Sequence, residues 1–191
     1  MKRNHPVHLA YAAAVAALYV VLTIIANSLG LASGIIQIRI SEALCVLPFF
    51  SPYYSFGLAV GCVLANLLTG CAPWDIVFGS LATLIGGLIC AFIGKKATGL
   101  AQESKAYKSL VLLSPLPNVI SNTLIVPPIL LYVYGMGLND LGSFAEICPI
   151  KSAYLLFTIT VFLGEMISGY LFGLLLFPAF RRIMKVVRPQ D

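Results

Sequence analysis

The chain has 191 residues, of which 60% are apolar or aromatic and 10% are charged, and its mean hydropathy is +0.97. Soluble domains carry about a quarter charged residues, so this composition excludes a disordered chain and argues against a water-soluble enzyme. At about 20 apolar residues per crossing, five or six helices would use most of the chain. We therefore expect an all-α polytopic membrane bundle that forms a single domain over residues 1–191.

The first predicted membrane span covers residues 8–29. Because the basic residues Lys2 and Arg3 precede it, a cleaved signal peptide is the competing interpretation. About twenty apolar residues exceed the usual length of the hydrophobic region of a signal peptide, and no convincing small-x-small cleavage motif follows. We therefore expect this segment to be a transmembrane helix.

The next segment, residues 35–50, is harder to interpret because it is short and contains Arg39 and Glu42. The dipeptide Ser51-Pro52 ends it. Four longer apolar runs follow, and the last of them is interrupted only by Glu165. These runs predict spans over residues 54–70, 76–94, 110–134 and 152–180.

The distribution of basic residues decides whether residues 35–50 cross the bilayer. If they cross, three basic clusters lie on one side of the membrane, where short basic stretches beside spans are typically cytoplasmic. If they do not, the second and third clusters move to the outside. We therefore expect six transmembrane helices with cytoplasmic N- and C-termini. The net charge of +5 is not a sign of nucleic-acid binding, because the basic runs are short and lack an aromatic platform. The clusters are Lys2 and Arg3; Lys95, Lys96, Lys105 and Lys108; and Arg181, Arg182, Lys185 and Arg188.

Small residues four apart recur on the predicted helices and would let helix backbones approach closely in lipid. Packing within the bundle is the favoured interpretation for the pairs Gly57–Gly61 and Gly169–Gly173. For a set of alanines on the first span, both internal packing and docking to another membrane protein stay open. These alanines are Ala10, Ala13, Ala14 and Ala17.

Four ionisable residues fall inside or beside the predicted spans, although a charge within a membrane costs about 2.5–3.5 kcal/mol on insertion scales. Such residues usually have a function, but each also has a structural interpretation. Arg39 and Glu42 are three residues apart and could form a local ion pair on one helix face. Asp75 could cap the helix that begins beside it, and Glu165 could bond to an asparagine or serine of another helix.

Uncharged polar and aromatic residues add to these candidates. Asn118 and Asn122 are four residues apart and share a helix face, so they could either hold a ligand or join two helices. Pro115 and Pro117 precede them and would disturb the start of that helix. Trp74 lies near a predicted interface, where the aromatic belt of membrane proteins also explains it.

The sequence gives little support for catalysis. It contains no HExxH, no GxSxG and no cluster with metal-ligand spacing. The five cysteines form no CxxC pair, and a Cys71–Cys148 bridge is a minor alternative. There is no P-loop either, so we expect no cofactor on this chain. Active transport would then need ATP hydrolysed by other polypeptides.

The motifs RxSEAL at residues 39–44 and DxxFGSLATL at residues 75–84 together resemble the QueT family. The resemblance covers roughly residues 8–180, and its specific part is the combination of these two motifs. Leu47-Pro48, Gly57-Leu58, Gly61 and Asn66-Leu67 also fit, as do Pro117-Asn118 and Asn122 in the second half. That half departs from the pattern at one point, because Pro115-Leu116-Pro117 stands where adjacent prolines are expected.

The resemblance implies the substrate-binding S-component of an energy-coupling factor (ECF) transporter in a prokaryotic cell membrane. Such a six-helix protein captures a vitamin-like solute at the outer face. It then docks, through small residues of its first helix, on a transmembrane T-component that carries two ATPases. The implied solute is a queuosine precursor, a deazaguanine base with or without an aminomethyl arm. The residues that match the docking face are Ala10, Ala13, Ala14 and Ala17.

The chemistry of such a base agrees with the polar residues of the spans. A guanine-like edge offers two adjacent donors that one carboxylate can accept, and we expect Glu165 or Glu42 to do so. A cationic aminomethyl group would need a second carboxylate, and Glu42, Asp75 and Glu165 could provide both. Additional candidates for ligand contact are Arg39, Asn118, Asn122 and, for stacking, Trp74 or a tyrosine.

Two other functions stay open on the sequence alone. One is a stand-alone secondary carrier for a small cationic or vitamin-like solute, which would depend on an ion gradient rather than on ATP. The other is an intramembrane enzyme or assembly factor that would depend on Glu165. The absence of an internal repeat gives the carrier little support.

Overall fold

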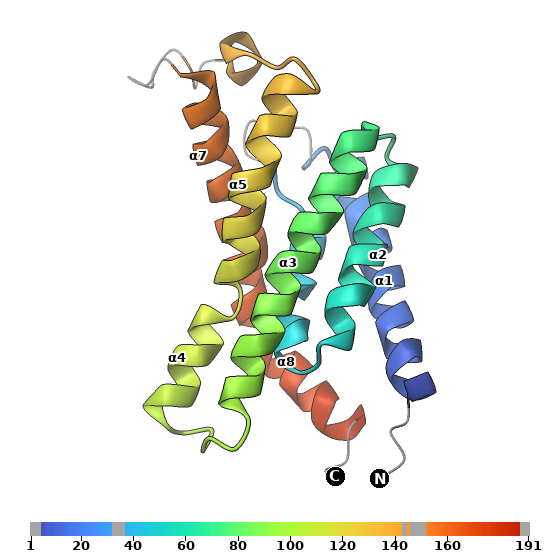
Figure 1. Cartoon of the computed structure of the whole chain (residues 1–191), viewed down its shortest axis with the longest axis vertical. Coiled ribbons are helices and arrows are strands. Elements are labelled where there is room, and N and C mark those ends of the chain that lie inside the picture. The colour runs from blue at the N-terminus through green and yellow to red at the C-terminus, as the bar shows by residue number, and fades with distance from the viewer. Residues whose placement is uncertain (1–4, 32–36, 143–144, 146–151, 188–191) are drawn as a thin grey trace.

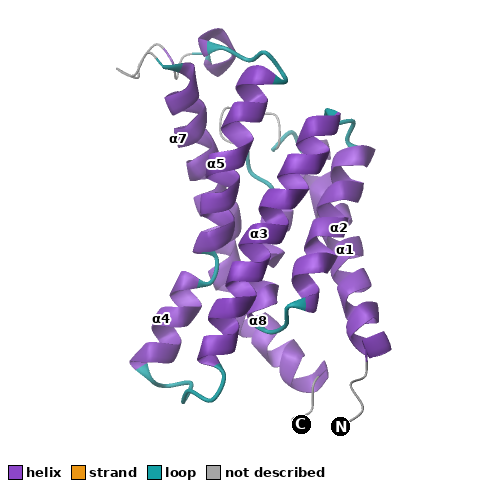
Figure 2. Cartoon of the chain, viewed as in Figure 1, coloured by secondary structure: helices purple, strands orange, loops and turns teal. Residues whose placement is uncertain are grey.

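The computed structural model describes residues 5–31, 37–142, 145 and 152–187, and these residues form helices and loops without a strand, as Figure 2 shows. Most of the helices are α-helices, η1 and η2 are 3-10 helices, and η3 is a π-helical turn. In chain order they are α1 (His5–Ser28), η1 (Ile40–Phe49), α2 (Tyr53–Leu68), α3 (Pro73–Ala97), α4 (Lys105–Leu113), α5 (Leu116–Tyr132), η2 (Leu138–Leu141), α7 (Ala153–Glu165), η3 (Met166–Leu171) and α8 (Phe172–Val187).

The helices run in alternating directions along the long axis of the molecule (Figure 1). The six passes are α1, η1, α2, α3, α4 with α5, and α7 with η3 and α8. Neighbouring passes pack as α1 on α2, α2 on α3, α3 on α5 and α5 on α7. Four helical runs are long and apolar enough to cross a membrane: Pro6–Ser28, Pro73–Ala97, Lys105–Tyr132 and Ala153–Met184. The predicted all-α bundle of six segments is confirmed.

The second pass is the central element of the bundle, because η1 contacts α1, α2, α3, η3 and α8. Its residues Ser41–Phe49 are all buried. The predicted helix over residues 35–50 therefore needs correction: residues 37–39 form no helix, Ile40–Phe49 is a 3-10 helix, and residues 35 and 36 lie outside the described part. Irregular backbone is tolerated at membrane depth where protein rather than lipid surrounds it.

Glycines let the surrounding helices approach η1 and each other. A Cβ atom at Gly94 of α3 would clash with the backbone of Phe49, and one at Gly173 of α8 would lie 2.8 Å from Val46 Cγ1. On the other side of the bundle, a Cβ at Gly61 of α2 would lie 2.9 Å from the Ala16 carbonyl oxygen of α1. The predicted role of the glycine pairs in internal packing is therefore confirmed.

The alanines of α1 divide into two groups. Ala12 and Ala16 are buried against Gly57 and Gly61 of α2. The alanines singled out from the sequence are instead exposed on the outside of the bundle, where nothing in the described chain covers them. They are Ala10, Ala13, Ala14 and Ala17.

Two predicted long helices are interrupted. The span predicted over residues 110–134 is broken at Ser114-Pro115 into α4 and α5, because a proline lacks the backbone N–H that would continue the helix. The span predicted over residues 152–180 contains the π-helical turn η3 directly after Glu165. The sequence indicated the first break through its prolines but gave no signal for the second.

The basic clusters gather at one end of the bundle. The start of α1, the α3–α4 loop and the end of α8 lie at that end (Figure 1), and they carry Lys95, Lys96, Lys105, Lys108, Arg181 and Arg182. The predicted even number of passes, which places the described basic clusters at the same end, is thus confirmed. The assignment of this end to the cytoplasm stays a prediction. We call this end the basic end. Some residues of the sequence analysis lie outside the described part of the chain: Lys2, Arg3, Arg188 and Cys148, the suggested partner of Cys71.

Candidate functional site

Glu42 is the most completely bonded carboxyl group in the bundle interior. It lies in the first turn of η1 and is 1% exposed. Its Oε1 accepts a hydrogen bond of 2.5 Å from the Tyr19 hydroxyl of α1. Its Oε2 accepts from the Asn118 amide at 2.8 Å and from the Cys45 thiol at 3.1 Å. Three donors therefore compensate the burial of this carboxyl group.

One carboxyl oxygen of Glu165 has no hydrogen-bond partner among the described residues. Glu165 is the last residue of α7, is 9% exposed, and accepts a hydrogen bond of 3.0 Å on Oε1 from the Asn122 amide of α5. Its Oε2 is buried and has no hydrogen-bond partner among the described residues, and the same holds for Oδ1 of Asn118. Buried polar atoms are nearly always hydrogen-bonded, so the carboxyl oxygen of Glu165 is a candidate for contact with another molecule. Ser55 Oγ and Thr123 Oγ1 are also buried without a partner among the described residues.

The four residues form a compact arrangement that we call the carboxyl cluster: Glu42, Glu165, Asn118 and Asn122. Asn118 and Asn122 are one helical turn apart on α5, and each gives its amide N–H to a different carboxyl group. Gly169 of η3 faces both acids, because a Cβ there would lie 3.5 Å from Glu165 Oε2 and 3.9 Å from Glu42 Cβ. The structure thus brings together four of the residues predicted from sequence.

Arg39 precedes η1 in an extended conformation and is half-buried. Its backbone N–H donates to the Ser168 hydroxyl of η3 at 3.1 Å. Among the described residues no carboxylate lies within 4.0 Å of its guanidinium group. The suggested local ion pair with Glu42 is therefore wrong, because Arg39 lies before the helix and not on a face that it shares with Glu42.

Asp75 lies in the first turn of α3, at the opposite end of this helix from Lys95 and Lys96, and it is 6% exposed. It is not the N-cap of α3, because that position is Ala72 and Asp75 follows in the first turn. Its Oδ2 accepts a hydrogen bond of 3.1 Å from the Tyr134 hydroxyl, which in turn accepts one of 2.9 Å from the Ala72 N–H. Burial raises the pKa of Tyr134 to about 12, so its hydroxyl keeps its proton at neutral pH.

Trp74 does not reach the carboxyl cluster. Its side chain is 59% exposed, and its ring stacks on Phe78 with the ring centroids 6.0 Å apart. Conversely, Tyr19, Cys45 and Ser168 belong to the surroundings of the site although the sequence did not single them out. They stand in apolar runs where an aromatic, a thiol or a hydroxyl is an ordinary packing residue, so no local signal marked them.

Comparison with known proteins agrees with these observations. The family model described as QueT transporter matches residues 9–182. A relative from Lactococcus lactis subsp. cremoris (strain MG1363), named "Queuosine precursor transporter QueT", is 36% identical over 86 residues, which are 44% of this chain and 50% of the relative. The chain thus spans about half the length of the curated relative that it matches. No solved structure matches the chain significantly.

The family match covers all six passes of the bundle and both halves of the carboxyl cluster. The resemblance seen in the sequence motifs is confirmed. This chain is a multi-pass membrane protein that belongs to the QueT transporter family.

Proposed function

We propose that this chain binds a queuosine precursor for uptake, as the substrate-binding S-component of an ECF importer. The solute would be a deazaguanine base with or without an aminomethyl arm. Membership of the QueT transporter family and the name of the Lactococcus lactis relative support the class of solute. The role as an S-component rests on the exposed alanines of α1 and on the lack of a P-loop in the sequence.

The observation that carries the proposal is the buried Glu165 Oε2 of the carboxyl cluster, which has no hydrogen-bond partner among the described residues. A deazaguanine edge offers two adjacent N–H donors, and a carboxylate oxygen that lacks a partner is suited to accept one of them. Glu165 has such an oxygen, whereas both oxygens of Glu42 are already bonded. We therefore assign the base edge to Glu165.

Charge in the bundle interior favours a cationic solute. Three carboxyl groups are buried there: Glu42, Glu165 and Asp75. Arg39 is the basic residue that the sequence analysis grouped with them. An aminomethyl group would add positive charge beside these acids. Entry would occur from the end of α3 that carries Asp75, because the basic residues of α3 lie at its other end. Trp74 is not among the proposed contacts, since its ring faces outward on Phe78.

Binding of the solute is tested with the purified full-length chain in detergent. Aminomethyl-deazaguanine, the unsubstituted deazaguanine, guanine and common vitamins are compared by thermal shift and calorimetric titration. We expect saturable binding of a deazaguanine. Glu165→Gln should weaken it about tenfold or more, because a hydrogen bond to a charged group contributes about 1.5–3 kcal/mol.

The matched control is Glu103→Gln, which removes a carboxylate that is exposed in the α3–α4 loop. It should leave the affinity unchanged. Unchanged affinity in Glu165→Gln would remove that residue from the site. A chain that binds guanine or a vitamin but no deazaguanine would refute the assigned class of solute.

Assembly with partners is tested by co-purification from cells that produce the chain with candidate T-components and ATPases. Ala13→Leu should reduce the recovered complex while solute binding persists, because the larger side chain holds the partner helix away from α1. Ala179→Leu, at another exposed alanine on α8, is the control. Transport by the isolated chain in vesicles without ATP would contradict the S-component role.

A further inference from the structure

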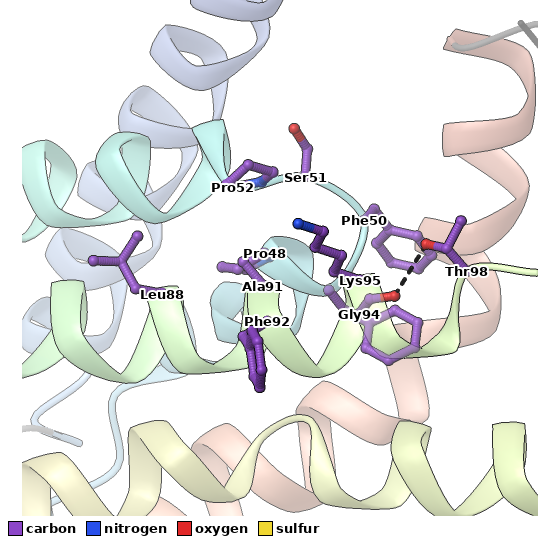
Figure 3. A pocket seen from close by; sticks show the side chains of 11 residues that line it. Pro48, Phe50, Ser51, Pro52, Leu88, Ala91, Phe92, Gly94, Lys95 and Thr98 are labelled. Atoms are coloured by element: carbon purple, nitrogen blue, oxygen red, sulfur yellow. Dashed lines mark hydrogen bonds between the residues drawn. The ribbon is translucent and has the colours of Figure 1, made fainter.

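A cavity of about 330 Å³ lies near the basic end, apart from the carboxyl cluster. It is bounded on one side by the turn from η1 to α2 and on the other by the last three turns of α3 (Figure 3). Most of its lining is apolar, including Pro48, Leu88, Ala91 and Phe92. None of its lining residues belongs to the carboxyl cluster, so the proposed solute site does not account for it.

One wall of this cavity carries positive charge. Figure 3 shows the Lys95 side chain extended toward Ser51 and Pro52. No carboxylate among the described residues lies within 4.0 Å of its ammonium group. A second cation stands beside it, since the Lys96 ammonium lies 4.8 Å from the centroid of the Phe92 ring. The site thus combines an apolar hollow with Lys95, which has no carboxylate partner among the described residues, while Lys96 lies next to it outside the lining.

The depth of the cavity in the membrane follows from α3. Nineteen uncharged residues separate Asp75 from Lys95, and at 1.5 Å per residue this helical run is about 30 Å long, which is the thickness of the hydrocarbon core. Lys95 therefore lies at the level of the lipid phosphates. α2 also begins at this level, directly after Ser51 and Pro52, and its positive dipole end adds to the charge of the lysines.

An apolar track continues from the cavity along α3. Leu88 and Phe92 are 41% and 57% exposed, and Leu81 and Ile85 extend the same helix face toward the other side of the membrane. From residue 81 to residue 92 the track is about 16 Å long at 1.5 Å per residue. This length accommodates most of a phospholipid acyl chain.

We propose that this cavity binds an anionic phospholipid, with the phosphate on Lys95 and an acyl chain in the apolar hollow and along α3. Charge complementarity and the position of Lys95 at the phosphate layer select a lipid as the occupant. Basic pockets between transmembrane helices are suited to lipid headgroups. The bound lipid would hold the η1–α2 turn against α3 at the basic end.

The proposal is tested with the purified full-length chain by native mass spectrometry against dioleoyl phosphatidylglycerol, with dioleoyl phosphatidylcholine and glycerol 3-phosphate as comparison ligands. We expect one saturable phosphatidylglycerol site that the other two ligands fill much more weakly. Lys95→Gln should weaken it about fivefold, the factor expected from loss of one basic contact with an anionic lipid. Lys95→Arg should stay within about twofold.

Two further variants separate this site from general attraction of the basic end. Lys105→Gln removes an exposed lysine of α4 that does not line the cavity, and it should leave the affinity within about twofold. Ala91→Leu keeps all charges and fills the hollow, so it should weaken the lipid. Equal loss in Lys105→Gln and Lys95→Gln, or equal binding of phosphatidylcholine, overturns the proposal. Glycerol 3-phosphate binding as well as the lipid would also overturn it, because the acyl chain would then contribute nothing.

Discussion

Two glutamates in the bundle interior have the same side chain and different roles. Both oxygens of Glu42 are satisfied by Tyr19, Cys45 and Asn118. Glu165 keeps one oxygen without a partner. A fully bonded buried carboxyl group fixes the positions of its neighbours, whereas an incompletely bonded one is costly until a ligand completes it. We therefore regard Glu42 as the residue that positions α1 and α5 around η1, and Glu165 as the residue that contacts the solute.

Tyr19→Phe tests the positioning role of Glu42. The change removes the donor to Oε1 in a site that water does not reach, and the carboxyl group loses one of its three bonds. We expect the free energy of unfolding to fall by about 1–3 kcal/mol, measured by thermal unfolding in detergent. Tyr11→Phe, on the same helix and half-buried, is the control and should have little effect. A stability equal to that of the control would show that the Tyr19 bond is dispensable.

Single residues could be predicted where they stand out chemically from their surroundings. Glu42, Glu165, Asn118 and Asn122 were found because polar groups in apolar runs are costly. Their pairing could not be predicted, since Glu42 and Asn118 are 76 positions apart in the chain. Tyr19 escaped notice because a tyrosine in an apolar helix is unremarkable until its hydroxyl is placed beside an acid.

A π-helical turn follows the end of α7 directly, beside the proposed solute site. Such turns insert an extra residue into a helix and are frequent at functional sites. Here η3 begins at Met166, directly after Glu165, and carries Gly169 toward both glutamates. The hydropathy of the sequence predicted a continuous helix at this position, because periodicity does not distinguish a π turn from an α turn.

Gly169→Ala tests whether the solute lies against the π-helical turn η3. The added methyl group would lie 3.5 Å from Glu165 Oε2, an ordinary contact distance, so the fold should tolerate it. We expect thermal stability near that of the unmodified chain and solute binding weakened about tenfold in calorimetric titration, within the 1–3 kcal/mol cost of overfilling a packed site. Gly137→Ala is the control, because a Cβ there meets nothing within 4 Å. Unimpaired binding in Gly169→Ala would place the solute elsewhere.

Local sequence patterns did not predict the geometry of the irregular elements η1 and η3. The first, third and fourth passes were predicted to within three residues at each end because each is a long apolar run bounded by charges or turns, whereas the last pass extends seven residues beyond its predicted end. η1 was predicted as a helix of the same kind, but its 3-10 geometry depends on the helices that surround it. The break between α4 and α5 could be expected from the sequence, since Pro115 and Pro117 lie beside it.

The proposed direction of transport depends on which end of the bundle faces the cytoplasm. All described basic clusters lie at one end of the bundle, and the Asp75–Tyr134 contact lies at the opposite end of α3. Positive charge beside spans is retained on the cytoplasmic side, so the end with Asp75 should be outside. Solute would then enter past Asp75 and reach the carboxyl cluster from the outer face, while the lipid proposed at Lys95 would belong to the inner leaflet.

Cysteine labelling on intact cells checks this orientation. In a background with Cys71 and Cys148 replaced by serine, the described cysteines that remain, Cys45, Cys62 and Cys90, are buried. Asn139→Cys places an exposed thiol on η2, and Glu103→Cys places one in the α3–α4 loop. A membrane-impermeant maleimide should label the first on intact cells and the second only after permeabilisation, because the basic loop is held inside. The reverse pattern would turn the carboxyl cluster toward the cytoplasm, and capture of solute from the outside would no longer be possible by this route.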